Sequence, residues 1–323
     1  MINLGLLGAG RIGQVHAKAV AAHPNARIKS VYDPISEAAA RILATPASIE
    51  EILADPDIDG VLVCTPSDQH AAQIVAAVDA GKAVFCEKPI ATDVAATAQT
   101  LEHVKAVNGL LMLGFQRRFD PNFRALKSRL SDMGNLEQVV ITSRDPAAPP
   151  YSYMLSSGGL FKDMMIHDFD VARWLLGEEF VSVYAAGSAL TDPKVATEGQ
   201  DIDTASVVMT TASGRQVTIL NSRRASYGYD QRIEVHCERG MVQAQSVREN
   251  TVVVSDQDGI AERPLQDFFM TRYVQAYADE IVHFVDSLSA GTQPEVSGND
   301  GLQALRLAQA AGESLRTGQV VRL

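Results

Sequence analysis

The stretch "LGLLGAGRIGQVHAKAV", residues 4–20, decides the fold of the first part of this chain. An apolar strand leads into Gly8, Gly10 and Gly13, and a helical pattern follows. In this setting the first glycine permits a tight turn, the second lets the backbone approach a pyrophosphate, and the third allows close helix–strand packing. The start of the helix offers free N–H groups to phosphates. The stretch therefore predicts a dinucleotide site at Gly8, Gly10, Arg11 and Ile12.

Asp33 follows Gly13 by 20 residues and stands at the end of the second predicted strand. A carboxylate at this place accepts hydrogen bonds from ribose hydroxyls and repels a 2′-phosphate, which favours NAD over NADP. The alternative is that Asp33 only caps the helix that follows Pro34.

The first part of the chain alternates short apolar runs with helical patterns. Because the runs lack an alternation of polar and apolar residues, they suit a parallel, doubly wound sheet that is covered on both faces. We expect strands at 2–7, 28–32, 60–64, 83–86 and 110–115, and helices at 11–23, 35–44, 48–54, 68–80 and 92–107.

In the middle of the chain, strands follow one another, and several alternate polar with apolar residues. This pattern predicts a large, mainly antiparallel sheet with one open face in an α+β domain. We expect a division into an NAD-binding Rossmann domain, 1–118, and a substrate-binding and oligomerisation domain, 119–323. The strands are expected at 136–144, 180–187, 203–211, 215–224, 230–237, 240–246 and 251–255, and the helices at 119–132, 158–177, 271–290 and 299–317, the last packing back on the first domain.

Polar residues follow two of the buried strands of the first domain. Lys88 stands in "EKP" after the strand at 83–86, and Thr65 and Pro66 stand in "TPSDQH" after the strand at 60–64. Ligands of open α/β sheets bind at the carboxyl ends of the strands. Pro89 restricts Lys88 to extended geometry and aims its ammonium, although a lysine at a sheet edge can also simply reach solvent. His70 is expected either to contact the cofactor or to cap its helix.

An acid and an imidazole interrupt the apolar helix expected at 158–177. Asp163 and His167 are four residues apart and would project from one face of a continuous helix. A histidine can take a proton near neutral pH, whereas an isolated one is more often a satisfied core residue. A second stripe, formed by Met165, Phe169, Ala172 and Leu176, is expected to hold the helix against the core, and Asp168 and Asp170 are expected at a solvated or interdomain edge.

The totals exclude several classes of protein. The net charge of −11 over 323 residues argues against nonspecific binding to nucleic acid or to an anionic membrane surface. The three cysteines are far apart, no histidine stands in a zinc-type spacing with them, and no G-x-S-x-G elbow occurs. Because no basic leader or membrane-length apolar run is found, we expect a cytoplasmic protein with reduced thiols. The spacing of the histidines and cysteines predicts no metal site.

The ordered motifs "GAGRIG", "TPSDQH", "EKP" and "DMMIHD" resemble the Gfo/Idh/MocA oxidoreductases over essentially the full chain. Within that family, "GFQRRFDPNF" (114–123) and "NSRRASYGYDQRIEV" (221–235) are most similar to the members that oxidise inositol. The resemblance implies an NAD-dependent dehydrogenase. The implied catalytic residues are Lys88, Asp163 and His167; Thr65, Pro66, His70 and Glu87 would join the NAD site, and Arg117, Asp145, Tyr227 and Tyr273 the substrate site.

The resemblance also implies a reaction, the oxidation of a secondary hydroxyl of a cyclic polyol, with myo-inositol as the favoured substrate. His167 would act as general base, Lys88 would polarise the reacting oxygen, and Asp163 would orient them. Another polyol or sugar, such as scyllo-inositol or glucose, stays open as substrate, and so does a catalytically inactive sensor of NAD or sugar. Members of this type are often tetramers, so we expect a homotetramer formed through the open sheet face.

Residues 34–60 depart from the family pattern, because the segment is short and contains no clear strand. Either the edge strand is reduced to a few residues around Pro46, or part of this loop is not represented in the sequence. The segment lies on the adenosine side of the expected site, which puts the packing of the adenine in question and leaves the chemistry untouched.

Overall fold

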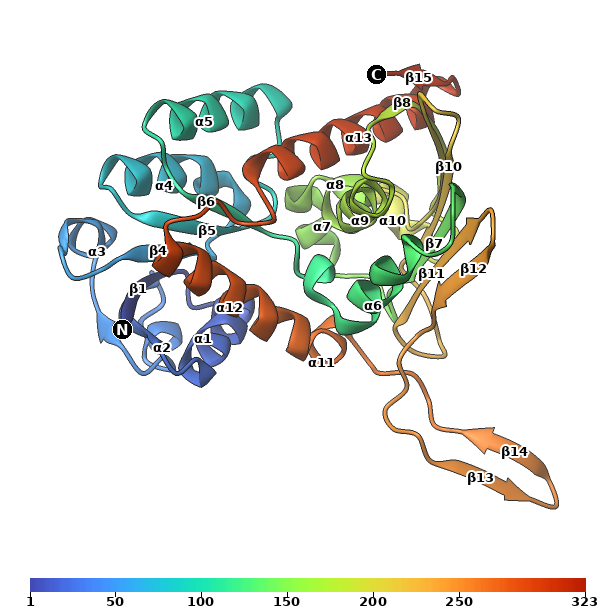
Figure 1. Ribbon diagram of the computed structural model, residues 1–323, viewed down its shortest axis with the longest axis horizontal. Coiled ribbons are helices and arrows are strands. Elements are labelled where there is room, and N and C mark those ends of the chain that lie inside the picture. Colours follow the sequence, from blue (N-terminus) through green and yellow to red (C-terminus); the bar gives the residue numbers. More distant parts are fainter. The chain divides into compact units, whose positions relative to one another are not determined.

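The computed structural model describes residues 1–323, except for the side chain of Ser156, and shows two compact units (Figure 1). Unit 1 comprises Met1–Phe119 and Gln275–Arg306, and unit 2 comprises Asp120–Val274 and Leu307–Leu323. The units differ from a single division after residue 118, because Gln275–Arg306 clusters with the N-terminal part of the chain.

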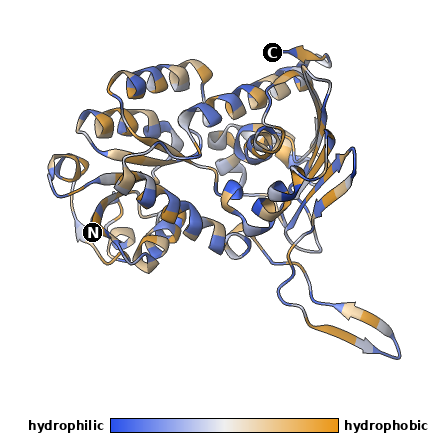
Figure 2. Cartoon of the chain, in the orientation of Figure 1, coloured by the Kyte–Doolittle hydropathy of each residue, from blue (hydrophilic) through white to orange (hydrophobic). Residues whose placement is uncertain are grey.

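Unit 1 contains a six-stranded sheet in the order β3-β2-β1-β4-β5-β6, with every neighbouring pair parallel. This is the doubly wound order, so the predicted Rossmann sheet is confirmed. The strands are predominantly apolar (Figure 2), and β4 and β6 are buried over their whole length. Their bounds are β1 (Ile2–Leu7), β2 (Ala26–Tyr32), β3 (Thr45–Pro46), β4 (Gly60–Val63), β5 (Ala83–Glu87) and β6 (Leu111–Gly114).

The crossover helices of unit 1 follow the predicted pattern, although the helix expected at 35–44 is much shorter. The bounds are α1 (Arg11–Ala22), α2 (Ser36–Ala39), α3 (Ile49–Ala54), α4 (Ser67–Asp79) and α5 (Val94–Ala106), and a 3-10 helix η1 (Gln116–Phe119) follows β6. The edge strand β3 is reduced to Thr45 and Pro46, which pair with Ser30 and Val31 of β2. The first explanation of the short segment is therefore correct.

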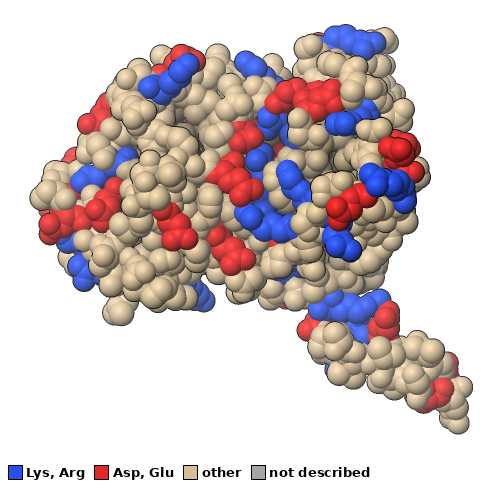
Figure 3. Space-filling view, viewed as in Figure 1, with Lys and Arg blue, Asp and Glu red and all other residues tan. Residues whose placement is uncertain are grey.

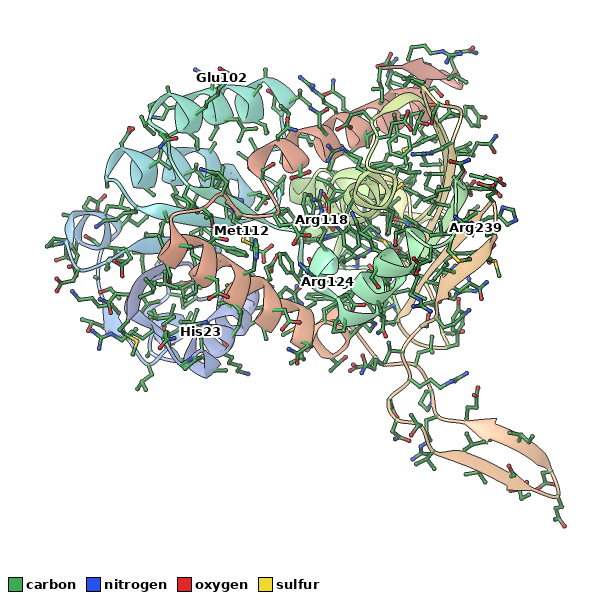
Figure 4. All side chains as sticks on the ribbon, in the orientation of Figure 1. His23, Glu102, Met112, Arg118, Arg124 and Arg239 are labelled. Carbon is green, nitrogen blue, oxygen red and sulfur yellow. The ribbon has the colours of Figure 1, made fainter. Side chains whose placement is uncertain are left out.

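The helix α12 (Val274–Ala290) returns to the sheet of unit 1. Phe284 meets the ring of Phe85 edge-on, with ring centroids 5.8 Å apart. Next along the chain, Ser297 forms a β-bridge with Met112 of β6, which is labelled in Figure 4. Burial of aromatic side chains stabilises such contacts strongly, and this explains why the segment belongs to unit 1.

Unit 2 contains a seven-stranded sheet in the order β12-β11-β7-β10-β9-β8-β15. The pair β7–β10 is parallel and the other pairs are antiparallel, so the sheet is mixed, close to the mainly antiparallel sheet expected. The bounds are β7 (Leu136–Arg144), β8 (Phe180–Ser188), β9 (Thr204–Thr211), β10 (Gln216–Ser222), β11 (Asp230–Cys237), β12 (Gly240–Ala244) and β15 (Val321–Arg322).

The register of the seven-stranded sheet places two apolar rows on its inner face. Every member is at most 3% exposed, and each row crosses five strands. Helices of unit 2, α9 among them, pack against this face (Figure 1). The rows are Ala185–Val207–Ile219–Ile141–Ile233 and Val183–Met209–Val217–Val139–Val235. The helices of the unit are α6 (Pro121–Leu130), α7 (Tyr151–Ser157), α8 (Gly159–Asp163), α9 (Ile166–Leu176), α10 (Lys194–Thr197) and α11 (Phe269–Arg272). The helix α13 (Gly298–Thr317) is shared between the units.

The single helix expected at 158–177 is two helices. The break is a wide turn in which the N–H of Met165 donates to the carbonyl of Leu160, five residues back, at 2.9 Å. Such a turn shifts the helical register by one residue. Asp163 ends α8 and His167 lies in the first turn of α9, so the prediction of one continuous helix that carries both residues is wrong.

The strand expected at 251–255 is not part of the large sheet. Instead β13 (Val253–Asp256) and β14 (Gly259–Glu262) form a separate hairpin that extends away from the sheet of unit 2 (Figure 1). All its residues are exposed, including Val253, Val254 and Ile260.

Candidate active site

The glycine loop after β1 has the geometry that a phosphate site requires. Gly8 has φ +94°, and a Cβ there would lie 2.6 Å from the carbonyl oxygen of Cys64. A Cβ at Gly13 would lie 2.0 Å from the carbonyl oxygen of Gly8. A Cβ at Gly10 would meet no heavy atom of the described residues within 4 Å. The protein's own packing thus explains two of the glycines, and the third leaves open space beside the backbone for a bound group.

The start of α1 directly follows the last residues of the glycine loop. Its N-cap is Gly10, and among the described residues no side chain caps the helix and no acid stands in the first turn. Asp33 anchors the loop from β2, since its Oδ2 accepts a hydrogen bond from the N–H of Ala9 at 2.7 Å. Its Oδ1 accepts from the N–H of Ile35, the N-cap residue of α2, at 2.8 Å, but among the described residues no side chain caps α2, so the alternative role of a helix cap is wrong. A carboxylate oxygen has further acceptor capacity, and these residues fit the phosphates and ribose of a dinucleotide.

His70 ties together the loops that follow β4 and β5. One ring nitrogen lies 2.8 Å from the carbonyl oxygen of Thr65, and the other lies 2.7 Å from that of Pro89. The side chain is 1% exposed, so it acts inside the protein between the two loops. The Lys88–Pro89 peptide bond is cis. His70 therefore supports "TP" and "EKP" from within.

Glu87 is held by the buried side chain of His16, a contact that was not predicted from the sequence. Nε2 of His16 lies 2.6 Å from Oε1 of Glu87, and the imidazole is 0% exposed. The His16 ring also meets Phe85 and Tyr277 edge-on. The signal in the sequence was the position of His16 on the buried face of α1, three residues after Gly13.

The thiols next to these loops are not nucleophiles. Burial, together with the neighbouring charge of Glu87, raises the pKa of Cys64 and of Cys86 well above the ordinary value. All three cysteines of the chain are free and buried, as expected.

Arg117 and its neighbour lie in η1, after β6. Both side chains are almost fully buried. Arg118, labelled in Figure 4, donates to Asp300 at 2.8 Å. Burial works against the charged form of Asp300, but the guanidinium outweighs it and holds the pKa of this carboxyl below its usual value. The ion pair fixes η1, and with it the backbone of Arg117.

Asp163 is held from two sides within unit 2. The hydroxyl of Tyr153 donates to its Oδ1 at 3.0 Å, and Nη2 of Arg223 lies 3.5 Å from its Oδ2. His167 is partly exposed, whereas Met165, Phe169, Ala172 and Leu176 are buried, as predicted.

Asp168 and Asp170 are both 0% exposed, so the prediction of a solvated edge is wrong. Oδ1 of Asp168 accepts a hydrogen bond from Ser143 at 2.6 Å, and Oδ2 accepts one from Asn221 at 2.9 Å. These charge-assisted bonds tie the first turn of α9 to β7 and β10. Asp168 thereby fixes the position of its neighbour His167.

Three of the residues expected at the substrate, Tyr273, Tyr227 and Asp145, lie in unit 2. Tyr273 is 0% exposed, and its hydroxyl donates to Gln231 at 3.4 Å. Tyr227 is 49% exposed and is bonded to Asp230 and Arg144, each at 2.7 Å. Among the described residues, Tyr227 thus joins neither Asp163 nor His167. Asp145 directly follows β7 and donates its N–H to Ser222 at 2.9 Å.

An open hollow of about 640 Å³ lies where β7 and β10 begin, at the end of these strands that is opposite to Asp145 and Arg223. Its lining includes Leu136 and Gln216, the first residues of β7 and β10, whereas Asp145 and Arg223 follow the last residues of these strands. Polar residues dominate the lining, and none is a predicted site residue, so we do not assign the hollow a role in catalysis.

Within the described part of the chain, no group of three or more His, Cys, Asp or Glu side chains could hold a metal ion. No described helix is long and apolar enough to cross a membrane. On the face shown in Figure 3, acidic and basic side chains are interspersed.

The chain is similar to characterised proteins over its full length. The model of an oxidoreductase family with an NAD-binding Rossmann fold, Gfo/Idh/MocA, matches residues 2–115, and the model of that family's C-terminal domain matches residues 123–243. An inositol 2-dehydrogenase of Rhizobium meliloti is 50% identical over 97% of both chains.

Two solved structures have the same fold. A myo-inositol dehydrogenase from Corynebacterium glutamicum has 39% identity and a TM-score of 0.95, covering 100% of this chain and 99% of that one. A scyllo-inositol dehydrogenase from Lactobacillus casei, with bound NAD(H) and scyllo-inositol, has 31% identity and a TM-score of 0.92 at the same coverage. With its glycine loop, its doubly wound sheet and these full-length matches, the chain belongs to the Gfo/Idh/MocA family of NAD-binding oxidoreductases.

Proposed function

We propose that this protein is an NAD-dependent dehydrogenase that oxidises myo-inositol at a secondary hydroxyl to the 2-ketone. The observation that carries the proposal is the 50% identity to the inositol 2-dehydrogenase of Rhizobium meliloti over 97% of both chains. The reaction removes a hydride from carbon and a proton from the hydroxyl, and yields the ketone, NADH and one proton.

The cofactor is NAD, and the loop of unit 1 would hold it. The uncapped N-terminus of α1 would bind the pyrophosphate beside Gly8, Gly10, Arg11 and Ile12, and Asp33 would bind the ribose. Thr65, Pro66 and Glu87 would line the site, with His70 behind them. NAD supplies the hydride acceptor when it is bound.

In this proposal, Lys88, Asp163 and His167 form the catalytic set. His167 takes the proton of the reacting hydroxyl, and the ammonium of Lys88 stabilises the negative charge that develops on the oxygen. Asp163 accepts a hydrogen bond from substrate or from its catalytic neighbours and keeps them oriented. The anchoring of α9 through Asp168 supports the role of His167, because it fixes the helical turn that carries the imidazole.

The substrate site is proposed to include Arg117, Asp145, Tyr227 and Tyr273. NAD binding is proposed for the first domain (1–118) and substrate binding and oligomerisation for the second (119–323), of which Gln275–Arg306 clusters with the first. The burial of Tyr273 favours a role in shaping the site over direct contact with a hydroxyl. Tyr227 is accessible and is oriented by Arg144 and Asp230, which suits a contact with a polyol.

We also propose a homotetramer formed through the open face of the unit 2 sheet. Tyr184 pairs with Val208 across β8 and β9, and each is 42% exposed. The row continues through Thr218 to Val140, which gives the open face an apolar centre. The exposed apolar hairpin also favours a partner, since a lone two-stranded hairpin is marginally stable in water. A cytoplasmic location is proposed on the strength of three free cysteines.

The direct test is steady-state activity with myo-inositol, scyllo-inositol and glucose, each with NAD and with NADP, followed by NADH or NADPH absorbance. We expect the highest kcat/KM with myo-inositol and NAD. A higher value with scyllo-inositol would favour the second candidate, which the scyllo-inositol bound to the Lactobacillus casei relative supports. Absence of turnover with any polyol, despite measurable NAD binding, would favour the sensor and overturn the proposal.

A further inference from the structure

Arg223 is a buried cation that the proposed mechanism does not yet use. It directly follows β10, its side chain is 2% exposed, and its backbone N–H donates to the carbonyl of Asp203 at 2.7 Å. Its guanidinium lies between two carboxylates, with Nη2 3.5 Å from Oδ2 of Asp163 and 3.7 Å from Oδ2 of Asp201. A buried charge is tolerated only when it is compensated, so these two acids account for its presence.

Asp201 is fixed by the backbone at the start of α8. Its Oδ1 accepts a hydrogen bond from the N–H of Leu160 at 3.0 Å. A Cβ at Gly159, which has φ +82°, would lie 2.8 Å from the same oxygen. The second glycine of "GGLFKD" is therefore required for the close approach of Asp201. Burial raises the pKa of Asp201 above its ordinary value, in spite of the nearby guanidinium.

The two acids share one guanidinium, but their other contacts differ. Asp201 faces the backbone of α8, whereas the second oxygen of Asp163 receives a hydrogen bond from the hydroxyl of Tyr153. Arg223 and Tyr153 thus hold opposite oxygens of the Asp163 carboxylate, and Asp201 holds Arg223 from the other side.

We propose that Arg223 is a positioning residue for the reaction: it fixes the orientation of the Asp163 carboxylate, while Asp201 holds the guanidinium in place. The inference rests on the proposed role of Asp163. Arginine suits this task because its planar group can address two carboxylates at once and stays charged when buried.

The test compares Arg223→Met, which keeps much of the volume and loses the charge, with Arg223→Lys, which keeps the charge. We expect Arg223→Met to lower kcat/KM for myo-inositol by about 10²-fold, the effect of a small displacement of a catalytic group. Arg223→Lys should recover most of that loss, and the Kd for NAD, measured by calorimetry, should stay unchanged in both. Equal losses in the two variants would overturn the inference, because space filling alone would explain them.

A double-mutant cycle with Asp163→Asn separates this inference from the proposed function. Adding Arg223→Met to Asp163→Asn should lower kcat/KM no further, since the group that Arg223 positions is already lost. A full additional loss would overturn the positioning role. Normal turnover in Asp163→Asn alone would instead overturn the proposed role of Asp163.

A second variant keeps the test decisive if Arg223→Met does not fold. Asp201→Asn combined with Arg223→Met removes one of the two carboxylates left without a cation, so it should fold and exceed Arg223→Met in kcat/KM or in thermal stability. No recovery of either quantity would show that the acids do not share the guanidinium, and would overturn the inference.

Discussion

At the scale of the residue, a glycine is needed at Gly8, Gly10 and Gly13 of the first loop for different physical reasons. Gly8 and Gly13 are required by the protein's own backbone, because a Cβ at either would overlap a carbonyl oxygen. A Cβ at Gly10 would face open space, so the packing of the described residues does not require this glycine, whereas a bound pyrophosphate would. The pattern of the sequence predicts these separate roles for the three glycines, and the contacts around Gly8 and Gly13 agree with the two structural roles.

This difference gives a paired prediction. Gly10→Ala should leave the melting temperature unchanged and weaken NAD binding, because the added methyl group enters only the space of the cofactor. Gly13→Ala should lower the free energy of unfolding by roughly 1–3 kcal/mol, the range for overpacking. Thermal unfolding without cofactor and calorimetric titration with NAD measure the two effects. Gly312→Ala, which meets no atom within 4 Å in α13, serves as a control with no loss of stability.

Lys88 gives the second prediction at this scale. Lys88→Ala should reduce kcat for myo-inositol by on the order of 10²–10³-fold, the effect of losing one preorganised donor at a developing oxyanion. The Kd for NAD should change little. Lys105→Ala, an exposed lysine of α5, is the matched control. Near-normal turnover of Lys88→Ala would contradict the catalytic assignment.

At the scale of the element, the segment that carries Asp163 and His167 shows the limit of periodicity. The predicted burial of its apolar stripe is confirmed, since Met165, Phe169, Ala172 and Leu176 are all buried. Its predicted continuity is wrong, because the i→i−5 bond of Met165 breaks the helix between the two polar residues. The helix propensities of the neighbouring residues do not indicate such a turn. The period of apolar residues therefore predicts which face of a helix is buried, but not where the helix is interrupted.

Asp168 gives a prediction at this scale. In Asp168→Asn the two bonds from β7 and β10 lose their charge, and the amide of Asn221 faces a second amide. The free energy of unfolding should fall by about 1–3 kcal/mol, the cost of an unsatisfied buried group. Urea unfolding of this variant beside Asp286→Asn, an exposed acid of α12, measures the effect. Equal stability of both variants would show that α9 does not depend on this anchor.

At the scale of the whole molecule, the open sheet face of unit 2 predicts assembly. Val208→Glu places a charge in the apolar centre of that face, next to Tyr184. We expect the mass in light scattering to fall from that of a tetramer to that of a smaller species. Val107→Glu makes the same change at an exposed site of unit 1 and should leave the mass unaltered. An unchanged mass of Val208→Glu would place the interface elsewhere.

The acid limit of stability depends in part on Asp230. Burial works against its charge, but hydrogen bonds from Arg232, Ser246 and Tyr227 outweigh burial and lower its pKa in the folded state. A carboxyl with a lowered folded pKa stabilises the fold at pH above its unfolded pKa of about 3.9, and this contribution is lost as the pH falls through the folded pKa. Asp230→Asn should therefore be less stable than the parent at pH 7, and the gap should narrow below about pH 4. Urea unfolding at both pH values tests the trend.

The resemblance of the ordered motifs to a known family implied the set of residues proposed for chemistry. The sequence by itself determined the Rossmann sheet, its glycine loop and the alternation that predicts the second sheet. These features depend on local sterics and on the period of apolar residues, which a chain shows before it folds. Only the tertiary structure decided the parallel pairing of β7 with β10, the return of α12 to unit 1, the His16–Glu87 pair and the place of Arg223 beside Asp163. Each of these joins residues far apart in the chain, and no local pattern specifies which distant partner closes a contact.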